Sequence, residues 1–86
     1  MKSFVIACSV NEENKEISRV ISTCSPNILK LHQYLWIVKS DLTPYEIVDR
    51  INKVIDVPFG EKVFVCELTN NFDASVGTGL IEGILR

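Results

Sequence analysis

Two stretches of apolar residues at helical spacing divide this chain of 86 residues, and short β-prone runs lie before, between and after them. Residues 17–24 and 47–55 repeat apolar side chains three or four positions apart, the spacing of one buried helix face. The β-prone runs are residues 2–9, 28–40 and 62–68. The middle run is long enough for two strands, because the polar pair His32-Gln33 favours a tight reversal or bulge. The order strand, helix, strand, strand, helix, strand predicts an α+β, ferredoxin-like βαββαβ fold, an antiparallel sheet with two helices on one face.

The boundaries of the first helix follow from its flanking polar residues. Asn11 is a candidate N-cap, and Glu12 and Glu13 would then lie in a first turn, where the helix dipole favours acidic side chains. Pro26 cannot continue a helix, so the helix should stop before it. We therefore expect this helix to begin soon after Asn11.

The second helix carries the clearest local signal in the chain. Thr43 is a typical N-cap, Pro44 suits the first helical position, and Glu46 stands where it completes a capping box. The segment 56–60, which contains Pro58, should end this helix.

The length of the chain predicts one domain, and its apolar content predicts that two copies of the chain associate. A chain this short builds a single small core, so we expect one domain over residues 1–70 and a C-terminal tail over 71–86. Hydrophobic residues make up 47% of the chain, and several strands are apolar on both faces although two helices can cover only one. The apolar face of the sheet that the helices leave uncovered predicts a homodimer, whose interface could include the tail. The candidate interface residues are Tyr34, Trp36, Phe64, Cys66, Leu80 and Ile84.

Charge and cysteine usage argue against several classes of protein. The formal net charge is −2 and the nine basic residues are dispersed, so the sequence shows no electrostatic footprint for nucleic acid. The three cysteines fit neither a disulfide framework nor paired metal ligands, which predicts reduced thiols and a cytoplasmic protein. The apolar run ahead of Cys8 is too short for a signal sequence. No stretch is long enough to span a membrane.

Three strand sequences resemble the SinR-like branch of the CRISPR-associated "Cas two" superfamily, small ferredoxin-like proteins to which VapD-type toxins are also similar. These sequences are Met1-Lys2-Ser3-Phe4-Val5-Ile6, Leu35-Trp36-Ile37-Val38-Lys39-Ser40 and Lys62-Val63-Phe64-Val65-Cys66-Glu67-Leu68. The resemblance covers about residues 1–70. It implies the ferredoxin-like fold, a dimer, and a role in a mobile-element or phage-defence context.

The resemblance also implies where a nuclease site would lie. Nucleases of that superfamily hold a divalent cation with an aspartate at the end of the first strand, where this chain has Cys8 and Ser9. A hydroxyl is a poor substitute for a carboxylate toward a hard cation, so we expect no metal site, no cofactor and no catalytic residue. A rearranged site that uses Glu12 or Asn11 stays open as an alternative.

The remaining candidate residues favour plain structural roles. His32 is the only histidine and has no ligand partner at suitable spacing, so it reads as a turn residue. Gly77-Thr78-Gly79 lacks the lysine of a phosphate-binding loop. Cys8 and Cys66 lie in apolar runs that favour inert packing over nucleophilic chemistry. Tyr34 and Trp36 could stack on a nucleic-acid base, but packing fits the negative charge better.

Two functions from different classes follow. The first is a non-catalytic dimeric binding or scaffold protein that contacts another protein or nucleic acid. The alternative is a metal-dependent endoribonuclease or deoxyribonuclease of the superfamily with a rearranged active site.

Overall fold

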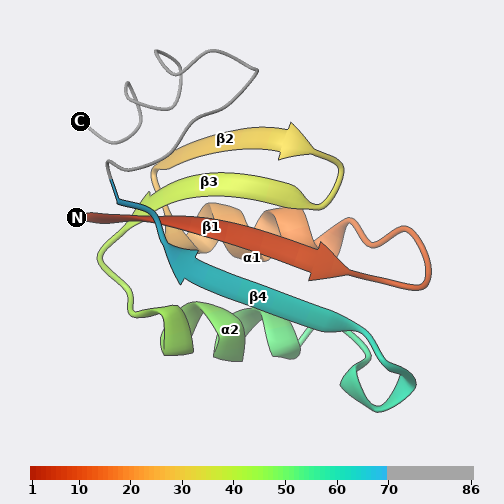
Figure 1. Cartoon of the computed structure of the whole chain (residues 1–86). Helices are drawn as coiled ribbons and strands as arrows, with labels where there is room; N and C mark the ends of the chain where they lie inside the picture. Colours follow the sequence, from red (N-terminus) through yellow and green to blue (C-terminus); the bar gives the residue numbers. More distant parts are fainter. Residues whose placement is uncertain (70–86) are drawn as a thin grey trace.

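The computed structural model describes residues 1–69, which form the fold drawn in Figure 1. A short 3-10 helix, η1, precedes the last strand. The elements are β1 (Lys2–Ser9), α1 (Glu16–Cys24), β2 (Asn27–His32), β3 (Leu35–Ser40), α2 (Pro44–Asn52), η1 (Val57–Phe59) and β4 (Lys62–Glu67). The α+β, ferredoxin-like βαββαβ arrangement predicted from the sequence is confirmed. The predicted tail, with Leu80 and Ile84, lies outside the described residues.

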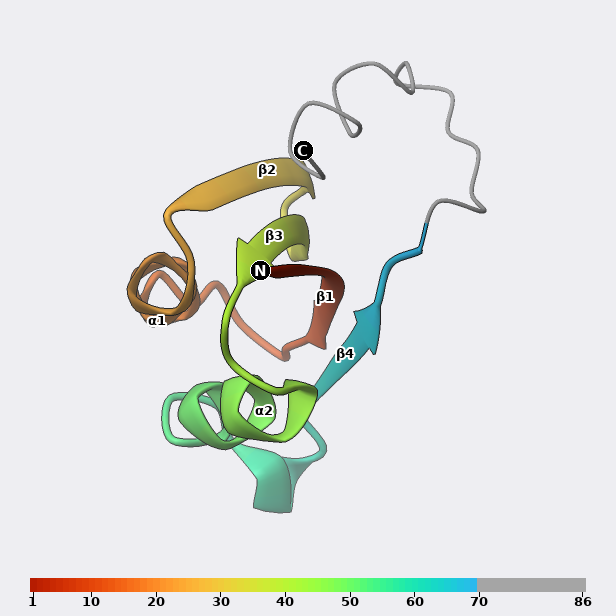
Figure 2. The same ribbon diagram turned by 90° about the vertical axis from the view of Figure 1, so that its left-hand side faces the viewer.

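The four strands form one antiparallel sheet in the order β2-β3-β1-β4. β1 is central and pairs with β3 on one side and β4 on the other, so Phe4 lies opposite Val38 and Glu67. Both helices lie on one face of this sheet, as Figure 2 shows when the strands are viewed nearly end on. The sheet therefore has one face covered by helices and one that no described helix covers.

The hydrophobic core lies between the sheet and the two helices. Each helix contributes a pair of isoleucines one turn apart, and alternate residues of β1 and β3 face them. The fully packed members are Phe4, Ile6, Ile17, Ile21, Trp36, Val38, Ile47 and Ile51.

The predicted start of the first helix is wrong. α1 begins at Glu16, and Lys15 precedes it without a side-chain cap. Asn14 supplies a local tie instead, because its Oδ1 accepts the Glu16 N–H at 3.0 Å. Asn11 lies in the loop ahead of the helix, where its main-chain and side-chain N–H groups bond to residues near β4.

The predicted start of the second helix is confirmed. Thr43 Oγ1 accepts the Glu46 N–H at 3.2 Å, and Glu46 Oε1 accepts the Thr43 N–H at 3.2 Å, which completes the capping box. The regular helix ends at Asn52, earlier than the apolar spacing suggested. Val54 and Ile55 nevertheless pack against the core from the following turn.

The two middle strands also form as predicted. A turn at residues 33–34 joins β2 to β3, and the pairing register shifts between Lys30 and His32. Neither α1 nor α2, each nine residues long, is long and apolar enough to cross a membrane.

Candidate functional site

The sheet face opposite the helices is apolar, and we call it the open face. Val5 of β1 pairs with Ile37 of β3 and with Cys66 of β4, so these side chains share one side of the sheet. By the same alternation the apolar residues of the open face are Val5, Ala7, Leu29, Leu35, Ile37, Phe64 and Cys66, of which Ile37 is only 3% exposed. The same registers place polar residues toward the ends of this face, namely Ser3, Ser9, Asn27, Lys39 and Lys62. A half-exposed antiparallel sheet normally carries polar side chains on its water side. Four strands of this sheet instead contribute apolar ones.

The accessible part of the open face lies on β4. Phe64 has 63% of its surface exposed, and Cys66 on the same strand is also exposed. Ala7 lies directly opposite Phe64 in the register and is half-buried. An exposed aromatic side chain therefore stands beside a residue too small to fill the space next to it.

The structure divides the predicted interface residues between the two faces. Phe64 and Cys66 lie on the open face, whereas Trp36 is 2% exposed and belongs to the core under the helices. Tyr34 packs edge-on against Trp36 with 6.1 Å between ring centroids, and its hydroxyl accepts the Asn14 N–H at 2.9 Å. Trp36 and Tyr34 therefore stabilise the monomer and do not contribute to the open face.

Sequence reasoning missed several residues of the open face. Val5, Ala7, Leu29, Leu35 and Ile37 were not singled out, although the strict alternation of strands assigns them to this side. The signal was present in the register: once Phe4 and Ile6 point to the core, Val5 and Ala7 must point away from it.

The three thiols lie in different environments. Cys8 packs against the core, and burial raises its pKa to about 11. Cys24 is buried at the end of α1. The inert packing predicted for Cys8 and Cys66 is wrong for Cys66 within the single chain, because its thiol is exposed on the open face.

Ser9, at the position where the resembling nucleases carry an aspartate, is exposed at the end of β1. Its cross-strand neighbour is Lys62, the first residue of β4. A lysine ammonium beside this position would repel a cation, so the local charge disfavours the metal chemistry of the family. His32 is exposed at the end of β2, where it was predicted to serve the reversal.

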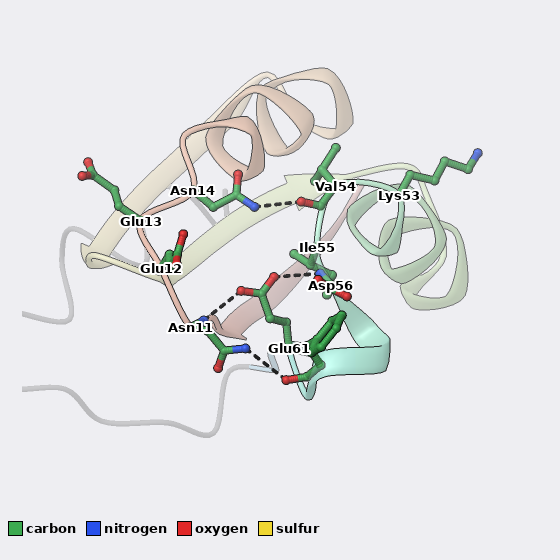
Figure 3. A pocket seen from close by; sticks show the side chains of 10 residues that line it. Asn11, Glu12, Glu13, Asn14, Lys53, Val54, Ile55, Asp56 and Glu61 are labelled. Atoms are coloured by element: carbon green, nitrogen blue, oxygen red, sulfur yellow. Dashed lines mark hydrogen bonds between the residues drawn. The ribbon is translucent and has the colours of Figure 1, made fainter.

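A second cluster joins the two loops that lead out of β1 and into β4. Glu61, only 8% exposed, accepts the Asn11 N–H at 2.8 Å and the Asp56 N–H at 2.7 Å, one with each carboxylate oxygen. Asn11 Nδ2 also donates to the Phe59 carbonyl at 3.0 Å, and Asn14 Nδ2 donates to the Val54 carbonyl at 2.7 Å (Figure 3). The bonds made by Asn11 and Asn14 tie residues 40 to 50 positions apart. The two main-chain N–H groups that bond to Glu61 lower the pKa of its carboxyl group.

An open depression of about 730 Å³ lies between these loops. Glu12, Glu13 and Asp56 give its rim negative charge, and Lys53 adds a positive one. Both oxygens of Glu61 are already engaged by main-chain donors, so this carboxylate holds the loops together. Within residues 1–69, no three His, Cys, Asp or Glu side chains come together in a way that could hold a metal ion.

Comparisons with protein-family models, with curated proteins and with solved structures find no match for this chain.

Proposed function

We propose that this chain is a non-catalytic binding or scaffold module that works as a homodimer through its open face. The observation that carries the proposal is the exposure of Phe64 and Cys66 beside the partly buried Val5 and Ala7, on the sheet face opposite the helices. Contiguous apolar surface of this kind marks an interaction site more often than a solvent boundary. The resemblance to the SinR-like proteins suggests a mobile-element or phage-defence context for this role.

The shape of the open face favours a second copy as its partner. A two-fold dimer uses the same patch on both subunits, so the patch must present both a projection and a place to receive it. Phe64 supplies the projection and its neighbour Ala7 leaves the space. Two sheets stacked face to face pack their inner side chains in this interdigitated way.

Light scattering coupled to size exclusion tests the proposal over a micromolar dilution series. We expect a mass of twice 9.7 kDa at the upper end of the series. Phe64→Asp would place an unpaired charge in the interface and should weaken the dimer at least about tenfold.

Tyr45→Asp is the matched control. Tyr45 is 81% exposed on α2, on the other side of the sheet, so this variant makes the same kind of change away from the open face and should remain dimeric. A monomeric wild-type protein across the whole series would refute the dimer.

A further inference from the structure

The short helix η1 carries two exposed apolar side chains on a turn outside the core. Val57 and Phe59 have 50% and 77% of their surface exposed. Figure 2 shows this segment, drawn in teal, beyond α2 on the side of the sheet that carries the helices. Neither side chain contributes to the open face, so the proposed dimer leaves both uncovered.

The main chain under these two side chains is held by hydrogen bonds. The Phe59 N–H donates to the Asp56 carbonyl at 3.1 Å, and the Gly60 N–H donates to the Val57 carbonyl at 3.0 Å. Gly60 closes the turn with a left-handed φ of 89°, and the Phe59 carbonyl accepts a bond from Asn11 Nδ2. An aromatic side chain on a fixed main chain loses little entropy when it binds, which suits a residue that anchors an interface.

The depression of about 730 Å³ beside this turn is mostly negative, because four carboxylates and one lysine line it. The lysine, Lys53, is already paired with Asp49 at 3.6 Å. By contrast, the side-chain oxygens of Glu12, Glu13 and Asp56 accept no hydrogen bond and join no ion pair within residues 1–69. These three carboxylates are therefore available to a cation from outside the chain.

Two observations indicate which kind of cation fits. In the part of the chain that the structure describes, no three acidic, histidine or cysteine side chains could hold a metal ion. The Phe59 ring offers an apolar surface at the same place, and a guanidinium group can stack on such a ring while its N–H groups bond to carboxylates. The depression is open to solvent, so it suits a side chain on the surface of another protein better than an enclosed small molecule.

We propose that the η1 turn and the depression beside it dock an arginine-bearing segment of a partner protein. The guanidinium group lies over the Phe59 ring and between the carboxylates of Glu12 and Asp56, which Figure 3 shows on the two loops that flank the depression. An apolar residue next to the arginine packs on Val57. This surface is separate from the open face, so a dimer would present two such docking surfaces.

An amide NMR titration of the isotope-labelled full chain tests the inference. The probe is the peptide acetyl-Gly-Leu-Arg-Arg-Gly-amide. Its matched control replaces both arginines by citrulline, which has nearly the same shape and no charge. We expect the arginine peptide to cause saturable shifts at residues 11–14 and 53–61, and the citrulline peptide to bind at least about fivefold more weakly. Sodium chloride should weaken the arginine peptide more than the citrulline peptide.

Two variants remove the two parts of the docking surface. Phe59→Ser removes the ring, and E12Q/D56N removes two of the available charges. Each should weaken the binding of the arginine peptide at least about fivefold. Unchanged amide signals outside the two loops would show that the fold of each variant persists.

The control variants make the same kinds of change elsewhere. Tyr45→Ser removes an aromatic ring that is 81% exposed on α2. E16Q/D41N removes two exposed acidic groups that do not line the depression. Both controls should bind the arginine peptide as the wild type does.

Several results would overturn the inference. These are equal affinity for the arginine and citrulline peptides, binding that Phe59→Ser leaves unchanged, and no saturable shift at millimolar peptide. Displacement of the peptide by magnesium chloride beyond that by sodium chloride of equal ionic strength would also overturn it, by assigning the carboxylates to a metal ion. Phe64→Asp disturbs the proposed dimer alone and should bind the peptide as the wild type does, so a failed dimer and a failed docking surface are distinguishable.

Discussion

The three cysteine residues of this chain differ in how far their thiols are exposed to solvent. Cys8 points toward the helices from β1, where burial raises its pKa to about 11, and Cys24 is buried at the end of α1. Cys66 lies on β4 at the edge of the sheet and is exposed. The thiolate is the reactive form of cysteine. Burial therefore slows the reaction of a thiol in two ways, because it excludes the reagent and because it favours the protonated form. The exposed thiol of Cys66 can therefore report, by its reaction rate, whether the open face is accessible to solvent.

We expect one fast-reacting thiol per native chain at pH 8 in dilute solution, and three after denaturation. Ellman's reagent measures this count, and Cys66→Ser should remove the fast phase. Cys8→Ser is the control and should keep it. A fast phase that disappears with Cys8→Ser would contradict the assignment of the two faces.

At the scale of elements, the fold depends on side-chain bonds that join distant loops as well as on its helices and strands. Glu61 holds the loop after β1 to the turn before β4 through the main-chain N–H groups of Asn11 and Asp56. These two bonds favour the charged carboxylate and lower its pKa below the ordinary value of 4.5. The stabilisation is therefore fully present above that value and is lost as the pH falls through the folded-state pKa.

Glu61→Gln tests this role through its pH dependence. The amide nitrogen of glutamine cannot accept a hydrogen bond, so one of the two main-chain donors loses its partner. We expect the variant to unfold at lower urea concentration than the wild type at pH 7, with a difference that shrinks at pH 3. Glu13→Gln, on the exposed rim of the same depression, should match the wild type at both values. A difference between Glu61→Gln and the wild type that does not depend on pH would show that the carboxylate charge is not involved.

Local sequence signals explain which elements could be predicted. The capping box at Thr43 and the β-prone run over residues 62–68 depend on neighbours within a few positions, and the structure has both. The start of α1 was mistaken because the groups of Asn11 bond to residues 48 and 50 positions away. No local pattern reveals such partners. Glu61 escaped prediction for the same reason.

At the scale of the whole molecule, the candidate site depends on which face each strand residue takes. Sequence reasoning expected an excess of apolar surface and a second face to cover, but it placed Trp36 among the candidate interface residues. The structure places that side chain under the helices. Aromatic residues of different strands look alike in a sequence, and only the pairing of β1 with β3 and with β4 places Trp36 and Phe64 on opposite faces. The register of the strands therefore decides which side chains the uncovered face presents.

The same register supports a prediction about chemistry. A nuclease site of the resembling family would need a carboxylate where Ser9 stands, and the neighbour of Ser9 across the sheet is Lys62. In a two-fold dimer Ser9 and Lys62 would each occur twice, so neither copy would supply a carboxylate at this position. We expect magnesium and manganese to leave the melting temperature unchanged, and RNA and DNA to remain uncleaved above a buffer control. The variant S9D/K62S restores the carboxylate without a lysine to neutralise it and should gain a metal-dependent rise in melting temperature, whereas K62S alone should not.

Metal-dependent cleavage by the unmodified protein that Glu12→Gln abolishes would instead support the rearranged nuclease, because an acid on the loop after β1 would then supply the missing ligand.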